Sequence, residues 1–224
     1  MTSFRIRIQS GLFAVLMICL AAAAIYAQAQ QKPIPIELPK PGYEGTPQNL
    51  KVTNLEKPTK RGPFLAPAGV VNVSKDKKVM SGDKQAAAED LELITDGDKT
   101  QADGNNVELG PGVQHVTIDL GALHEIHAVV VWHYFAPRVY FCVVAQTAED
   151  AAFTKNVQTI FSNDLENKTG TGAGKDMHYL ESYQGKLIDA KGVLGRYVRL
   201  YSNGNNANAL NDYIEVEVFG KPAK

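Results

Sequence analysis

Strict alternation of apolar with polar or aromatic residues near the C-terminus is the feature that most constrains this fold. Residues 196–201 place Val198 and Leu200 on one side of an extended chain and Tyr197, Arg199 and Tyr201 on the other. Residues 213–219 repeat the pattern, with Ile214, Val216 and Val218 facing away from Tyr213, Glu215, Glu217 and Phe219. A period of two indicates strands of a sheet with one face on a core.

The segment between these two strands is rich in asparagine. Residues 202–211 hold five asparagines and one glycine. Asparagine tolerates left-handed backbone and hydrogen-bonds its own turn, so a purely structural turn is the first interpretation. The alternative is a ligand-binding loop, in which Asn203, Asn205 and Asn208 are the candidate contacts.

The N-terminus has the pattern of a secretory signal. Arg5 and Arg7 precede an apolar run from residue 12 to residue 25, and small residues at Ala27 and Ala29 suit a signal peptidase. The sequence predicts a signal peptide over 1–29, cleaved before Gln30, and a protein that is secreted, periplasmic or at the cell surface. The run is short for a membrane span, which needs about 20 apolar residues, so an uncleaved anchor is the weaker alternative.

Charge and cysteine content narrow the class of protein further. Two of the 23 basic residues and none of the 24 acidic residues precede residue 30, so the mature chain carries a slight negative charge. It therefore lacks the basic footprint of a nucleic-acid-binding protein. Cys142 alone remains after cleavage, which excludes an internal disulfide, and its apolar neighbours predict a buried free thiol in a strand.

Proline separates the signal peptide from the folded part. Eight of the eleven prolines lie in residues 30–68. Because repeated X-Pro pairs favour extended polyproline conformations, this segment is predicted to be a semi-rigid linker that holds a domain away from a membrane or wall. A disordered leader without function is the alternative. The folded domain is expected over 69–220, followed by a tail of residues 221–224.

The domain itself is predicted to be all-β. About eight short strands, separated by turn signals, indicate an antiparallel sandwich or barrel. One short helix is expected over residues 86–93, and residues 121–124 are expected to turn the chain. Residues 126–134 are almost continuously apolar, which is typical of a strand buried on both faces.

Several blocks occur in the order found in one known family. Asp96-Gly97 is followed by VTIDLG at residues 116–121, then by RYVRLYSNG at 196–204 and EVEVFG at 215–220. In these blocks the chain resembles the discoidin family, also called coagulation factor 5/8 type C domains. The resemblance implies a galactose-binding-like jelly-roll sandwich. It also implies a binding module that contacts glycans, phospholipid or protein through loops at one end, and a structural calcium ion in many members.

The resemblance points to a calcium site. Asp96 and Glu215 match the two acidic positions that share the ion in the family, and Asp98 and Thr100 are plausible additional ligands. Calcium takes six to eight oxygen ligands, and Gly97 lets the backbone fold so that carbonyl groups point inward. The alternative is an Asp-Gly turn whose acids are simply solvated.

The loop after the central strand offers groups suited to a sugar. Sugar recognition combines an aromatic face with planar polar groups that hold hydroxyls. His133, Tyr134 and Arg138 supply such groups, and Arg138 follows a proline, as an arginine often does in sugar-binding relatives. Alternatively, Tyr134 and Phe135 belong to the core and Arg138 to a surface ion pair. Phe135 is expected in the core.

These observations predict a secreted, non-catalytic carbohydrate-binding module with a possible structural calcium ion. The alternative is a protein–protein interaction or assembly module of a cell-envelope or extracellular complex. No nucleophile elbow is present. The glycine-rich segment at 169–175 lacks the first glycine and the final hydroxyl residue of a phosphate loop, so an enzyme is not expected.

Overall fold

The computed structural model describes residues 31–41, 50–57, 59–102, 104–134 and 138–223. The signal peptide predicted over residues 1–29 lies outside these ranges. The described residues form two compact units. In the first, β1 (Gln31–Pro33) and β2 (Leu65–Pro67) pair as a small antiparallel sheet.

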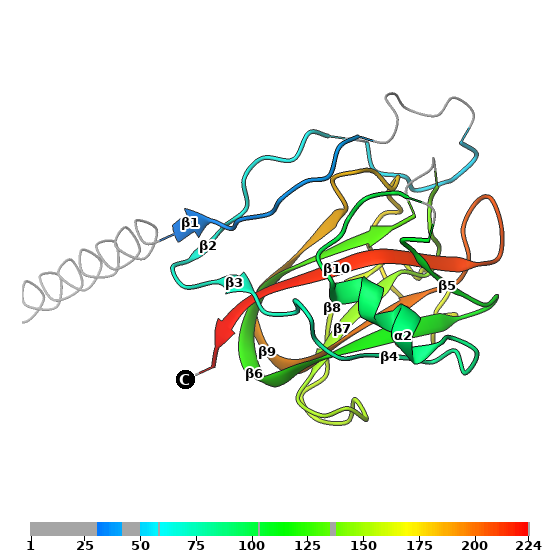
Figure 1. Ribbon diagram of the computed structural model, residues 1–224. Helices are drawn as coiled ribbons and strands as arrows, with labels where there is room; N and C mark the ends of the chain where they lie inside the picture. Colours follow the sequence, from blue (N-terminus) through cyan, green and yellow to red (C-terminus); the bar gives the residue numbers. More distant parts are fainter. Residues whose placement is uncertain (1–30, 42–49, 58, 103, 135–137, 224) are drawn as a thin grey trace, which may run out of the picture. The chain divides into compact units, whose positions relative to one another are not determined.

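The second unit is an antiparallel β-sandwich, in agreement with the predicted fold class and with the architecture that the discoidin resemblance implies (Figure 1). Its strands follow the order β3-β10-β6-β9-β7-β8, with β4 on β6 and β5 on β10. A short helix α2 (Ala88–Leu91) continues into a 3-10 turn η1 (Glu92–Thr95), close to the helix expected from sequence. The strand bounds are β3 (Val71–Asn72), β4 (Val79–Ser81), β5 (Val107–Leu109), β6 (Gln114–His133), β7 (Val144–Ala148), β8 (Gln158–Ser162), β9 (Lys186–Ser202) and β10 (Asn211–Pro222).

A long antiparallel ribbon of β6 and β9 builds the centre of the sandwich. Pairing runs from Gln114 opposite Ser202 to Val131 opposite Lys186. The first half of β6 also pairs with β4, and the second half with β10. Apolar side chains from both halves of the ribbon enter one core, among them Val116, Ile118, Val129, Val131, Ile188, Val198 and Leu200.

The prediction of a turn at residues 121–124 was wrong, because β6 passes through this segment without a break. The register with β9 shifts between Asp119 and His124, and Gly121 takes a positive φ of 83°. A glycine adopts that backbone at little cost. The local signals that suggest a turn therefore mark an irregularity within one long strand.

The strand predicted over residues 213–219 has one face on the core, as expected, but its other face is buried as well. Every residue from Asn211 to Gly220 is buried. Glu215 and Glu217 are covered by the segment after η1, where the Gly97 amide donates to Glu215 Oε2 (3.1 Å) and Lys99 Nζ lies 2.6 Å from Glu217 Oε1. A register shift between Tyr213 and Glu215 brings Tyr213 into the core together with Val216 and Val218.

Cys142 is free and buried, as expected, but it does not lie in a strand. It occupies a bend with φ of 52°, and β7 begins only at Val144. A positive φ at a residue other than glycine is uncommon and carries backbone strain. Burial is the main cause that raises the pKa of the thiol to about 11, so the group stays protonated at neutral pH.

Part of the proline-rich segment contacts the sandwich. Leu55 forms a parallel bridge with His178, and amide–carbonyl bonds join Glu56 to His178 (2.8 Å) and His178 to Asn54 (2.9 Å). Lys186 Nζ is 2.8 Å from Glu56, and the Arg61 amide donates to Gln184 Oε1 at 3.0 Å. We call residues 50–62 the strap. In the described part of the chain, no helix has the length and apolar character of a membrane span.

We expect the strap to stabilise the sandwich. A chain that begins at residue 63 should lose about 2 kcal/mol relative to one that begins at residue 50, because it lacks these hydrogen bonds and the Glu56–Lys186 ion pair. That loss lowers the melting temperature by about 4–8 °C in a domain of this size. Differential scanning calorimetry of both chains measures the difference, and equal melting temperatures would contradict the expectation.

Candidate functional site

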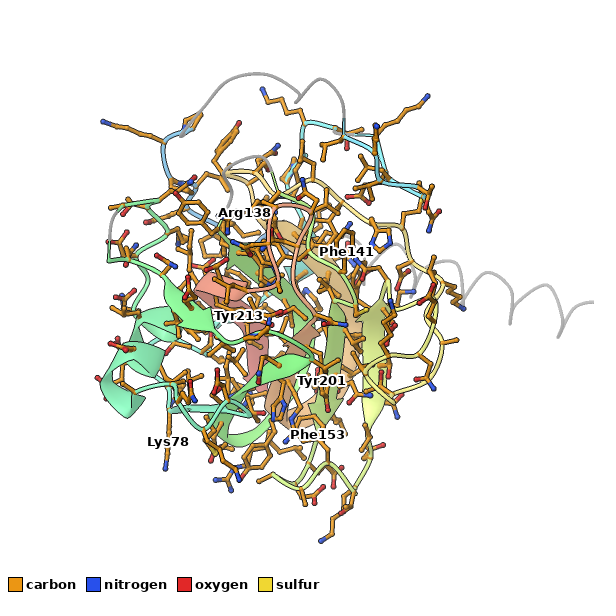
Figure 2. All side chains as sticks on the ribbon, turned by 90° about the vertical axis from the view of Figure 1, so that its right-hand side faces the viewer. Lys78, Arg138, Phe141, Phe153, Tyr201 and Tyr213 are labelled. Carbon is orange, nitrogen blue, oxygen red and sulfur yellow. The ribbon has the colours of Figure 1, made fainter. Side chains whose placement is uncertain are left out.

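Two loops that are distant in sequence meet at one end of the sandwich. The backbone of residues 138–142 pairs with that of residues 203–206: Tyr140 bridges Asn205, the Asn203 amide donates to the Phe141 carbonyl (2.8 Å), and the Phe141 amide donates to the Gly204 carbonyl (3.0 Å). Figure 2 shows Arg138 and Phe141 at this end, while Phe153 and Lys78 lie at the opposite end. We call the end that carries Arg138 and Phe141 the loop end.

Arg138 is the centre of the loop end. Its Nη1 donates to Asp212 Oδ2 at 2.7 Å, and the Tyr140 hydroxyl donates to the same oxygen at 3.0 Å. The guanidinium lies over the Tyr134 ring, 4.7 Å from the ring centre, and its side chain is 19% exposed. The arrangement therefore presents a fixed cation, a fixed carboxylate and an aromatic ring side by side.

The pKa values of Arg138 and of its neighbour Tyr140 are both raised. Burial raises the pKa of Tyr140 well above its usual value, and the nearby Asp212 carboxylate raises it further. Burial acts to lower the pKa of Arg138, but its contacts with Tyr140 and Asp212 outweigh that effect and raise it. Tyr140 is thus a neutral hydrogen-bond donor and Arg138 a permanent cation at every physiological pH.

His133, a predicted ligand-binding residue, supports this end from inside. Its side chain has no exposed surface. The ring stacks on Tyr140 at 4.4 Å, and its Nδ1 lies 2.6 Å from Glu181 Oε1. Among the described residues, His133 Nε2, Glu181 Oε2 and the Tyr179 hydroxyl have no hydrogen-bond partner. Such buried polar atoms are commonly satisfied by ordered water.

The asparagine loop is largely built from its own hydrogen bonds. Asn205 is buried, and its Oδ1 accepts from the amides of Ala207 (2.8 Å) and Asn208 (3.0 Å). Its Nδ2 donates to Asn208 Oδ1 at 2.8 Å and to the Leu210 carbonyl at 3.0 Å. The geometry agrees with the structural interpretation of Asn205 and Asn208. Asn203 is half-buried beside Cys142, with Nδ2 4.0 Å from the sulfur.

Some residues of the loop end were not among the sequence-based candidates. Phe141 is partly exposed and meets the His178 ring edge-on, with ring centres 5.6 Å apart. Burial lowers the pKa of His178, so this ring is neutral at pH 7. Phe141 was not chosen as a candidate because it lies in an apolar run that was predicted to be a strand. Nothing in the sequence singles out Asp212 as the partner of Arg138. Phe135 and Pro137 lie outside the described residues.

Three of the four predicted calcium ligands lie in the loop after η1, and the fourth, Glu215, lies on β10. The loop after η1 forms consecutive turns, in which the Asp98 amide donates to Asp96 Oδ1 (2.7 Å) and the Thr100 amide donates to Asp98 Oδ1 (2.9 Å). The Thr100 carbonyl accepts from Asn105 Nδ2 at 2.7 Å. One oxygen of the Asp98 carboxylate and the Thr100 carbonyl thus already accept hydrogen bonds within the loop. Within the described ranges, no three His, Cys, Asp or Glu side chains gather closely enough to hold a metal ion.

Glu215 is the member of this set that differs from an ordinary structural acid. It is fully buried, and its Oε1 has no hydrogen-bond partner among the described residues. Burial is the main cause that raises the pKa of Glu215 to about 9, and repulsion from Glu217 and Asp96 adds to it. Two ammonium groups lie close by: Lys99 Nζ pairs with Glu217, and Lys75 Nζ donates to the Asp96 carbonyl at 3.2 Å.

At the level of sequence, no protein-family model and no curated protein matches the chain. Comparison of structures finds several similar chains. A family 89 glycoside hydrolase from Clostridium perfringens shares 18% identity at a TM-score of 0.49; the match covers 68% of this chain but 15% of that one. The present chain thus corresponds to a small part of that enzyme.

Two further similar structures are isolated modules. Chitosan-binding module 1 of a chitosanase/glucanase from Paenibacillus sp. IK-5 has 17% identity and a TM-score of 0.48, covering 66% of this chain and 98% of the module. A fucose binding module from Streptococcus pneumoniae has 15% identity and a TM-score of 0.44, covering 66% of this chain and 96% of the module. At these identities the similarity is one of fold alone.

Asn205→Ala should destabilise the domain by about 1–3 kcal/mol, because it removes four hydrogen bonds made by a buried side chain. Urea unfolding measures the change. Asn203→Ala is the matched control, since its side chain makes one weak contact with sulfur, and it should cost less than about 0.5 kcal/mol. Equal losses would show that Asn205 does not organise the loop.

Proposed function

We propose that this chain is a non-catalytic carbohydrate-binding module that acts outside the cytoplasm after removal of residues 1–29. The observation that carries the proposal is the Arg138–Asp212 pair beside the Tyr134 ring at the loop end. The secretory pattern of the N-terminus supports the location.

The chemistry of the loop end suits a sugar ring. A sugar hydroxyl both donates and accepts hydrogen bonds, so it is matched by a guanidinium donor and a carboxylate acceptor that lie 2.7 Å apart. The carbon–hydrogen face of a sugar is apolar and packs on aromatic rings. Phe141 and Tyr134 are both partly exposed at this end. Among the described residues, both side-chain hydrogen bonds of Arg138 are made by Nη1, which leaves Nη2 and Nε to a ligand.

Rigid support strengthens the proposal. The buried Tyr140 hydroxyl and the backbone pairing of residues 138–142 with 203–206 hold Arg138 before a ligand arrives. A binding site whose polar groups are already in place loses less conformational entropy when it binds. The loop end therefore has the features expected of a preformed recognition site.

Arg138→Ala should reduce glycan binding by at least about 30-fold, because it removes a charge-assisted donor from the site. The measurement is a glycan array on residues 30–224, followed by calorimetric titration with a sugar that binds. Arg196→Ala is a matched control, since Arg196 also pairs with an aspartate, Asp119 (2.8 Å), away from the loop end. Full binding by Arg138→Ala, or equal loss in both variants, would contradict this assignment.

We also propose that calcium stabilises the loop after η1. Glu215 Oε1 is a buried oxygen without a hydrogen-bond partner among the described residues, and Asp96 lies close enough to repel Glu215. A bound divalent cation satisfies such an oxygen and keeps the carboxylate ionised. Glu215 and Asp96 would supply the side-chain ligands, and carbonyl groups of residues 96–100 would complete the set. Lys75 and Lys99 would compete with the ion for these oxygens.

The state of Glu215 leads to a pH prediction. In chelator the folded protein keeps Glu215 protonated up to about pH 9, whereas the unfolded chain ionises it above pH 4.5. The free energy of unfolding should therefore fall as pH rises between these values. Glu215→Gln should remove this slope and any stabilisation by calcium, and at pH 7 in chelator it should raise stability by about 1–3 kcal/mol.

Thermal melts of both proteins at pH 5, 7 and 8.5, each with calcium and with chelator, measure these effects. Identical calcium responses in wild type and Glu215→Gln would exclude Glu215 as a ligand. Identical pH slopes in chelator would show that Glu215 is ionised in the folded protein.

A further inference from the structure

The charge balance at the loop end indicates which sugars the site accepts. We propose that Asp212 makes the site selective for uncharged sugars and against sugars that carry a carboxylate, such as uronic acids. This inference rests on the proposed function and adds the class of ligand.

Asp212 is fixed and almost dry. Its side chain is 4% exposed, and one oxygen accepts hydrogen bonds from both Arg138 Nη1 (2.7 Å) and the Tyr140 hydroxyl (3.0 Å). This oxygen is paired with the cationic guanidinium and also accepts from a neutral hydroxyl. The negative charge therefore sits directly beside the guanidinium that a ligand would contact, and it cancels most of the attraction of Arg138 for an anion.

Among the described residues around Arg138, the neighbouring groups supply no surplus positive charge. Glu181 and His133 lie behind the pair and contact each other, with 2.6 Å between Oε1 and Nδ1. The His178 ring is neutral at pH 7 because burial lowers its pKa. Tyr140 and Tyr213 are uncharged, since burial raises the pKa of both. The cation Arg138 is thus matched by the Asp212 carboxylate, with which it pairs directly.

A sugar carboxylate is a poor match for this arrangement. It only accepts hydrogen bonds, so it pairs with the guanidinium but repels Asp212, and it loses its own hydration on binding. Two neighbouring hydroxyls avoid both costs, because one accepts from Arg138 while the other donates to Asp212. Specificity of this kind comes from the repulsive group as much as from the attractive one.

The test compares sugars that differ only in the carboxylate. Calorimetric titrations of residues 30–224 use three pairs of methyl glycosides: galactose with galacturonate, glucose with glucuronate, and mannose with mannuronate, at pH 7.5. We expect the best-bound neutral member to bind at least about tenfold more tightly than its uronate partner. We also expect its affinity to change less than about twofold between 50 and 500 mM salt.

Asp212→Asn keeps the shape of the side chain and removes its charge. It should reduce the ratio of the affinity for the neutral sugar to the affinity for its uronate partner by at least about tenfold. This ratio reports the effect of the charge even where the substitution changes both affinities. Asp119→Asn is the matched control, because Asp119 forms a similar pair with Arg196 (2.8 Å) and its amide bonds to Lys78, at the opposite end (Figure 2). It should leave the ratio unchanged. Thermal melts check that both variants are folded.

The outcomes separate this inference from the proposed function. Binding of a uronate as tightly as its neutral partner, or more tightly, overturns the inference and leaves carbohydrate binding intact. If Asp212→Asn does not fold, the wild-type ratios and their salt dependence still decide. An unchanged ratio in folded Asp212→Asn overturns the role of Asp212. Absence of binding to every glycan on the array overturns the proposed function and this inference with it.

Discussion

The antiparallel ribbon of β6 and β9 is the constraint on which the rest of the sandwich depends. Its register, from Gln114 opposite Ser202 to Val131 opposite Lys186, sends apolar side chains of both its halves into one core. A slip of one residue would turn every one of these side chains to the other face. Pairing extends to Ser202 at the end of β9 and, through β10, to His133 at the end of β6, so both strand ends next to the loop end are held by neighbouring strands.

The polar groups of the loop end depend on that support. Buried polar groups are stable only when they are paired, and here the pairing links elements distant in sequence: Arg138 with Asp212, His133 with Glu181, and residue 140 with residue 205. Each contact fixes one segment against another. The cation, carboxylate and aromatic rings at the surface are therefore held by the same network that fills the space beneath them.

Much of the fold was predictable from the sequence, because the strands that carry the core alternate strictly. The pattern at residues 196–201 and the apolar run at 126–134 both correspond to strands in the structure. The polar face of β10 was not predictable, since Glu215 and Glu217 are buried by a loop more than a hundred residues earlier. At the candidate site, residue type marks Arg138 and Tyr134 as candidates in the sequence, whereas Asp212 and His178 carry no such mark, because their contacts arise from pairings across the fold. His133, also a candidate from its residue type, lies beneath the surface of the loop end.

The central claim is that a sugar binds at the loop end through Arg138 and Asp212. The most direct measurement is a titration of ¹⁵N-labelled protein with the best-bound neutral sugar, followed through backbone and arginine side-chain NMR signals. The account predicts saturable shifts at Tyr134, Arg138, Phe141, His178 and Asp212, and none at Arg196 or Asp119. Shifts centred on another part of the sandwich, with the signals of Arg138 unchanged, would contradict it.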